Sequence, residues 1–222
     1  MFFLRGMSIS EMAEHMLLLI PALLIALTVH EFCHGYAAYK LGDKTAKWDG
    51  RLSFNPIRHI DPFGFLMILV VGFGWAKPVM VNPHNLRNPK KDMAIIAFAG
   101  PLSNFVAAFF TLLIFRIIIE FNLLPYHEIS FYVLRIIFNL YSINVVLGLF
   151  NLIPIPPLDG SKILGAFLPY HLYFRYMNFR YWFPVLLVLL VTGLFGIIIS
   201  PVAMTIATVY DLIIGLFLSL FR

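Results

Sequence analysis

Long apolar stretches alternate with short polar segments along this sequence. Five stretches approach or exceed the length of about 20 residues that an α-helix needs to cross a bilayer: residues 14–40, 92–121, 129–152, 182–199 and 202–221. Ser200 and Pro201 separate the last two, because proline disfavours a helix interior. The pattern therefore predicts five membrane-crossing helices.

A sixth apolar segment, Phe63–Trp75, contains three glycines and is too short to cross. We expect it to enter the membrane and turn back, or to lie at the membrane interface. On either side, residues 44–62 and 76–82 form short alternating pieces with proline and asparagine, which favour strands and turns over helix. The sequence predicts an all-α polytopic membrane protein with a short membrane-associated β-strand or hairpin. We expect about five full spans plus one re-entrant piece.

Composition agrees with a membrane protein. Hydrophobic residues make up 61% of the 222 residues and charged residues only 12%, which leaves too few polar groups to cover a water-soluble domain. We expect one membrane-embedded domain over 1–222, with a core at about 13–165 and a C-terminal helical pair at about 182–221. No appended PDZ-like or regulatory module is expected. The single cysteine, Cys33, excludes an intrachain disulfide.

The basic residues indicate an orientation, because lysine and arginine concentrate on the cytoplasmic side of membrane proteins. If Phe63–Trp75 does not cross, all sixteen basic residues except Arg5, Arg116 and Arg135 lie on one face. We therefore expect the N-terminus outside and the C-terminus in the cytosol of a prokaryotic cell. The lipid bilayer is the expected surrounding, and no nucleic-acid partner is expected.

The sequence His30-Glu31-Phe32-Cys33-His34 lies within the first long apolar stretch. Residues four apart share one helix face, so both imidazoles can bind one metal ion with the carboxylate beside them to transfer protons. Such groups are costly at membrane depth and therefore indicate a function. Two hydrogen-bonded histidines without a metal are the alternative. The cysteine turns about 100° from the second histidine and is expected to be a small apolar residue.

A catalytic zinc site needs a third protein ligand and an open position for water. Among the acids, only Glu31, Asp159 and Asp211 lie in or at the edge of the deep apolar stretches. Asp159 follows the helix predicted at 129–152, which brings it to the depth of His34 near the cytosolic side. It is therefore the favoured third ligand.

These positions predict a set of roles. His30, His34 and Asp159 bind one Zn²⁺ per chain, while Glu31 takes a proton from water and returns it to the leaving amine. Asp211 is expected to pair with a tyrosine or an arginine in the helix bundle. Three other histidines are expected to be solvated, namely His59, His84 and His171.

Four motifs in order resemble the site-2 proteases: HEFCH at 30–34, GWAKPVMVN at 74–82, GPLSN at 100–104 and NLIPIPPLDG at 151–160. These are intramembrane zinc metalloproteases that cut within or near transmembrane segments of other proteins. The resemblance covers about Ala13–Gly165 and is to the minimal branch, which lacks PDZ and CBS domains. Ser161 stands where the family often has a second glycine.

The resemblance implies zinc ligands at His30, His34 and Asp159, a catalytic base at Glu31, and a role for Asn151 in binding substrate or the developing oxyanion. Capping of the preceding helix is an equally supported role for Asn151. Asn104, in GPLSN, is expected to join helices rather than to contact the site. The segment 76–82 is a candidate edge for an unwound substrate strand.

The predicted function is that of an intramembrane zinc metalloendopeptidase acting in regulated intramembrane proteolysis, with transmembrane or membrane-associated proteins as substrates. A non-catalytic metal-binding membrane protein, such as a transporter or scaffold, is the alternative, although transport needs no residue like Glu31. A di-iron lipid desaturase is disfavoured because only one histidine box is present. A site with a downstream glutamate ligand is disfavoured because Glu120 and Glu128 fall on the outer side.

Overall fold

The computed structural model describes residues 8–71 and 74–221, and most of these residues are helical. Four of its helices are long and apolar enough to cross a bilayer: α1 (Ile9–Lys40), α4 (Pro89–Glu120), α5 (Glu128–Leu152) and α9 (Leu194–Leu218). This agrees with a multi-pass membrane protein. Arg5 and Arg222, which contribute to the predicted orientation, lie outside the described residues.

Helix α1 begins at Ile9, five residues before the predicted start at Glu14. A capping box explains the difference: the Glu11 backbone N–H donates to Ser8 Oγ, and the Ser8 backbone N–H donates to Glu11 Oε2. These bonds satisfy donors that the first helical turn leaves without partners. The helix continues through Pro21 and ends at Lys40.

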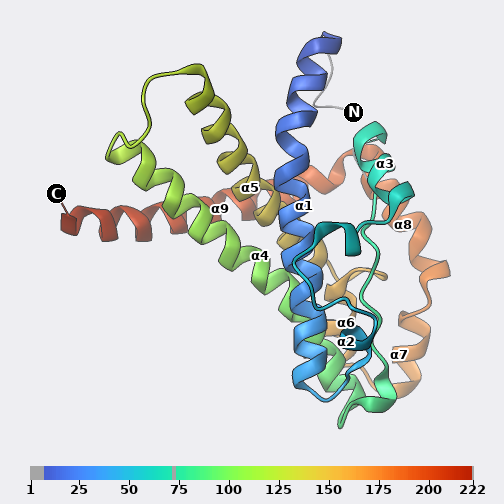
Figure 1. Ribbon diagram of the computed structural model, residues 1–222. Coiled ribbons are helices and arrows are strands. Elements are labelled where there is room, and N and C mark those ends of the chain that lie inside the picture. The colour runs from blue at the N-terminus through green and yellow to red at the C-terminus, as the bar shows by residue number, and fades with distance from the viewer. Residues whose placement is uncertain (1–7, 72–73, 222) are drawn as a thin grey trace.

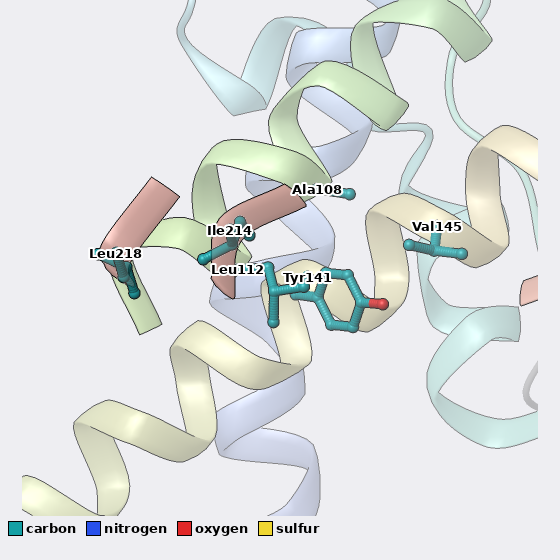
Figure 2. Close-up of a cluster of buried hydrophobic side chains, with 6 residues drawn as sticks. All are labelled: Ala108, Leu112, Tyr141, Val145, Ile214 and Leu218. Carbon is teal, nitrogen blue, oxygen red and sulfur yellow. The ribbon is translucent and has the colours of Figure 1, made fainter. Parts of the chain in front are cut away.

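Helices α1, α4 and α5 pack against one another, and α9 runs crosswise to α1 and contacts α4 and α5 (Figure 1). Apolar side chains of three of these helices form a buried cluster (Figure 2). Its buried members are Ala108 and Leu112 of α4, Tyr141 and Val145 of α5, and Ile214 and Leu218 of α9. The cluster joins the C-terminal helix to the bundle that carries the predicted site.

Short helices complete the chain. They are α2 (Thr45–Trp48), α3 (Pro62–Val71), α6 (Asp159–Gly165), α7 (Tyr170–Tyr176) and α8 (Phe179–Thr192), with single turns at Pro56–Arg58, Pro83–Asn85 and Ser219–Phe221. The prolines of 151–160 prevent a continuous helix as expected, since α5 ends at Leu152 and α6 begins at Asp159.

The predicted break at Ser200 and Pro201 is wrong. The chain turns instead at Gly193, whose φ of 73° suits glycine, while Pro201 lies inside α9. Proline is tolerated within membrane helices because neighbouring groups satisfy the backbone that it frees. Helix α8 has 14 residues, fewer than a bilayer crossing needs, so the fifth span stays a prediction.

The segment 76–82 is extended, but regular strand pairing is absent from the described part of the chain, where a single antiparallel bridge joins Ile60 to Ala76. Side chains satisfy the neighbouring backbone instead. Arg51 Nη2 donates to the carbonyls of Lys77 and Pro78 at 2.5 and 2.8 Å. These side chains bind backbone groups that a partner strand would otherwise use. The predicted hairpin stays a prediction.

Asp43 fixes the far end of this segment. Its buried carboxylate accepts hydrogen bonds from the backbone N–H and hydroxyl of Thr45, the backbone N–H of Asn82 and the side-chain amide of Asn85. Burial by itself raises the pKa of the Asp43 carboxyl, but these hydrogen bonds outweigh burial and hold the pKa below its ordinary value. The carboxylate thus ties the end of α1 to the loop that precedes α4.

Replacing Asp43 by Ala is expected to lower the free energy of unfolding at pH 7 by about 3 kcal/mol, because several donors lose a charged acceptor. A lowered folded pKa means that this contribution is present above a pH of about 4 and is lost as the pH falls through the folded pKa. Thermal unfolding in detergent between pH 7 and pH 3 measures the difference. Asp49→Ala, at an exposed position, is the matched control. An equal deficit at both pH values would contradict the assignment.

Candidate metal centre

Three potential ligand atoms converge where α1 meets the start of α6. His30 Nε2 and His34 Nε2 lie 2.9 Å apart, and Asp159 Oδ2 lies 3.2 Å from the first and 3.0 Å from the second. All three residues are buried. Among the described residues they are the group of histidine, cysteine and acidic side chains whose geometry can hold a metal ion. The structure thus brings the two histidines of α1 together with Asp159, which lies 125 positions after His34 in the sequence.

Helical spacing creates the wall of this centre. Ile96, Gly100 and Asn104 are four residues apart on α4, so they share one face, and that face meets the histidine face of α1. A Cβ atom on Gly100 would lie 2.4 Å from His34 Nε2, so any side chain there would displace the imidazole. The glycine of GPLSN therefore leaves room for the centre.

Gly160 has a similar role beside Asp159. A Cβ atom at this position would lie 2.1 Å from the carbonyl oxygen of Leu152, at the end of α5. Only glycine allows the broken segment to return so closely to the helix that precedes it. Lys162 Nζ lies 3.1 Å from Asp159 Oδ1, which leaves Oδ2 directed at the two imidazoles.

The protonation of His34 follows from its other ring nitrogen. His34 Nδ1 lies 2.7 Å from the backbone carbonyl of Ile96, which only accepts, so Nδ1 carries the hydrogen. In the neutral ring, Nε2 then presents a lone pair toward Asp159 Oδ2. Acceptors converge in a buried space here, an arrangement that a cation between them stabilises. Two imidazole nitrogens and a carboxylate oxygen form a donor set that suits zinc.

Glu31 lies beside this group without belonging to it. Its Oε2 accepts a hydrogen bond of 3.0 Å from the backbone N–H of Val79, in the extended segment 76–82. The carboxylate is largely buried. The Glu31 side chain therefore connects α1 to the extended segment that the sequence suggested as a substrate edge.

A cavity of about 530 Å³ adjoins the centre. His30, His34, Glu31 and Asp159 contribute to its wall, together with Asn151 and residues 78–81. Asn151 Nδ2 donates to the carbonyl of Leu147 at 3.0 Å, one turn earlier in its own helix, so its predicted capping and substrate-binding roles both stay predictions. A larger cavity of about 890 Å³ lies between the ends of α4 and α5, away from the convergent ligand atoms.

The structure confirms the prediction for Asp211 and corrects the predictions for Asn104 and His59. Asp211 pairs with Arg116 at 3.0 Å, as expected. Asn104 contacts the centre, with Oδ1 2.6 Å from His30 Nδ1, whereas the sequence favoured a packing role alone. His59 is 1% exposed, so its expected solvation is wrong: Nε2 donates to the Ser53 carbonyl within the folded loop.

The profile of peptidase family M50 matches residues 18–124 and 126–191 of this sequence. The chain belongs to peptidase family M50. The predicted resemblance to the site-2 proteases is confirmed, because M50 is their family.

Named relatives agree with the M50 assignment. YwhC of Bacillus subtilis, named as a candidate zinc metalloprotease, is 41% identical over 187 residues, which cover 82% of this chain and 84% of YwhC. Rip2 of Mycolicibacterium smegmatis, named in the same way, is 30% identical over 154 residues, or 67% of this chain and 56% of Rip2. A zinc metalloprotease of Methanocaldococcus jannaschii is 29% identical over 163 residues, or 73% of this chain and 38% of that protein. No solved structure matches the chain with significance.

Proposed function

We propose that this M50 peptidase is an intramembrane zinc metalloendopeptidase that hydrolyses peptide bonds within or near transmembrane segments of other proteins. The observation that carries the proposal is the convergence of His30, His34 and Asp159 beside Glu31 in a buried site that borders a cavity. Family membership and the names of the relatives support the chemistry. Comparison of the wild type with Glu31→Gln in a cleavage assay tests the proposal.

His30, His34 and Asp159 are the proposed ligands of one Zn²⁺ per chain. Bound zinc supplies a Lewis acid that activates water at neutral pH and polarises a carbonyl group. The Asp159 carboxylate lowers the net charge of the site, which reduces the cost of keeping it buried. Lys162, bound to the other oxygen of the same carboxylate, orients this ligand.

Glu31 is the proposed general base. It accepts a proton from the attacking water and donates a proton to the departing amine. The hydrogen bond from Val79 N–H leaves the second carboxylate oxygen for this exchange. A metal-binding protein without catalysis is not favoured, because binding of the ion does not require a carboxylate in this position.

Asn151 is proposed to bind the substrate carbonyl. One amide hydrogen donates to Leu147 O, and the other remains for a group in the cavity that Asn151 lines. A donor directed at the carbonyl oxygen stabilises the charge that develops there during attack. The bond to Leu147 and substrate binding are compatible in one side chain.

The extended segment 76–82 is proposed to bind the substrate backbone. A helical substrate hides its carbonyls, so it must unwind before hydrolysis, and an extended protein segment offers hydrogen bonds to the unwound chain. Met80 lines the cavity, and in the described structure its backbone forms no hydrogen bond. Its N–H and carbonyl therefore remain for a substrate strand.

Replacing Met80 by Pro is expected to slow cleavage about tenfold, because it removes one backbone donor from the substrate edge. Met80→Ala retains that donor and serves as the matched control, with a rate expected near that of the wild type. Zinc content should be unchanged in both variants, since neither touches a ligand. Cleavage rates on one single-pass substrate, together with metal analysis, measure both effects. Unimpaired cleavage by Met80→Pro would contradict the proposed substrate edge.

We further propose one membrane-embedded metalloprotease domain with five crossings, the short helix α8 supplying one of them. The basic residues favour an outer N-terminus, a cytosolic C-terminus and a site that opens toward the cytosol of a prokaryotic cell. The C-terminal end of α1, with Lys40 in its last turn, and the N-terminal end of α4, which begins at Pro89, lie at the same end of the bundle as α6 (Figure 1). Asp159 begins α6, which supports a site near that side.

A further inference from the structure

A row of buried amide side chains connects α5, α4 and α1 behind the metal centre. Asn144 and Asn104 are both 0% exposed. Asn144 Nδ2 donates to the carbonyl of Leu140 at 2.8 Å, and Asn104 Nδ2 donates to Asn144 Oδ1 at 2.8 Å and to the carbonyl of Ala26 at 3.2 Å. Asn104 Oδ1 then lies 2.6 Å from Nδ1 of His30.

The direction of every hydrogen bond in this row is determined. Leu140 O only accepts, so the nitrogen of the Asn144 amide must face it and the oxygen must face Asn104. Asn104 therefore turns its own nitrogen toward Asn144 and Ala26 and its oxygen toward His30. An oxygen at 2.6 Å requires the hydrogen on His30 Nδ1 and leaves the Nε2 lone pair free.

The two imidazoles obtain this tautomer in different ways. His34 donates to a backbone carbonyl, that of Ile96, whose identity as an acceptor never changes. His30 donates to an amide side chain, which can present either oxygen or nitrogen by rotating half a turn. A rotated Asn104 would face His30 Nδ1 with N–H groups, favour hydrogen on Nε2 and prevent this nitrogen from binding a metal. Asn144 opposes that rotation because it would bring two oxygens together.

We propose that Asn104 and Asn144 are positioning residues that fix His30 in the metal-binding tautomer, with Asn144 acting through Asn104. This inference rests on the proposed zinc site. Asn144 lies on a different helix from every proposed ligand, and its polar contacts are with Asn104 and Leu140. The packing of α5 against α4 thereby contributes to the affinity of the site for the metal.

Zinc affinity, measured by competition with a chelator in detergent, tests the inference. We expect Asn104→Leu to weaken zinc binding by about 10- to 100-fold, as loss of an outer hydrogen-bond partner commonly does, and Asn144→Leu by about tenfold. In the double variant, Asn144→Leu should add nothing to the loss already caused by Asn104→Leu, because its effect passes through that residue.

Asn139→Leu is the matched control. Asn139 also lies on α5, and its amide also bonds to another helix: it donates to the carbonyl of Leu18 of α1 at 3.3 Å, away from the centre. Its replacement is expected to lower the unfolding temperature of the zinc-free protein as Asn144→Leu does, while leaving zinc affinity unchanged. If zinc affinity is lost in the Asn144 variant and retained in the Asn139 variant, Asn144 acts by positioning His30 and not through general packing.

Equal zinc affinity in wild type and Asn144→Leu would overturn the inference, as would independent, multiplying losses in the double variant. If Asn104→Leu does not fold, the comparison of Asn144→Leu with Asn139→Leu decides the question alone. The two results that would overturn the inference differ from failure of the proposed function, because that failure would appear as a wild type without zinc affinity.

Discussion

Replacing Glu31 by Gln is expected to reduce peptide cleavage by about 10²- to 10⁴-fold while leaving the zinc content at the wild-type level. The amide has nearly the same shape but cannot take a proton from water, and general acid–base catalysis commonly contributes a factor of this size. Glu31 stands outside the group of convergent ligand atoms, so the metal should stay. Cleavage of a single-pass membrane protein and metal analysis on the same preparations measure the two effects.

The Glu31 experiment also decides between the two predicted classes of function. In a transporter or scaffold, Glu31→Gln would retain the metal and lose nothing that a cleavage assay detects, since the wild type would not cleave either. In a protease whose carboxylate is a ligand, zinc would be lost with activity. Only the combination of retained zinc and lost cleavage agrees with a base that does not bind the metal. Zinc loss in Glu31→Gln would contradict the assigned role.

Replacing Asp159 by Ala is expected to weaken zinc binding by at least about 100-fold and to abolish cleavage. The effect should exceed the loss seen for outer hydrogen-bond partners, because a direct ligand is removed. Two imidazoles would remain, without the third ligand that catalytic zinc sites contain. Chelator competition gives the affinity, and the same substrate gives the rate.

Asp211→Asn is the matched control for Asp159→Ala. Asp211 was the competing acid in the apolar part of the sequence, and in the structure it pairs with Arg116 on α4. Its replacement should leave zinc affinity and cleavage near their wild-type values. Full zinc binding in Asp159→Ala, or zinc loss in Asp211→Asn, would contradict the proposed ligand set.

Much of the candidate site could be predicted from the sequence because it depends on simple rules. The spacing of His30 and His34 fixes a shared helix face, and the prolines before Asp159 exclude a continuous helix. Charge distribution predicted that these two parts of the chain meet at similar depth, and the ligand geometry agrees. The lengths of the apolar stretches likewise predicted the three long helices that surround the site.

Other features depend on contacts that one sequence does not reveal. The loop before α4 looked strand-like, but Arg51, Glu31 and Asp43 bind backbone groups that a hairpin would pair. His59 looked solvated because its neighbours are polar, yet the loop folds around it. Local composition indicates which backbone groups need partners, while the tertiary fold decides which partners they find.

Asn144 was missed altogether, although a signal existed. An asparagine in the middle of an apolar helix lowers helix propensity and is costly at membrane depth unless it finds a partner. That cost singles out Asn144 as well as Asn104, but the sequence does not show that the two side chains meet. Their joint contact with His30 emerges only when α1, α4 and α5 are packed together.

The most direct test of the account is an X-ray absorption spectrum at the zinc edge of the purified wild type. We expect zinc with nitrogen and oxygen neighbours at about 2.0–2.2 Å, including the scattering pattern of two imidazoles. Two results would contradict a centre built from His30, His34 and Asp159: absence of zinc from a folded preparation, or a sulfur atom of Cys33 at about 2.3 Å from the zinc.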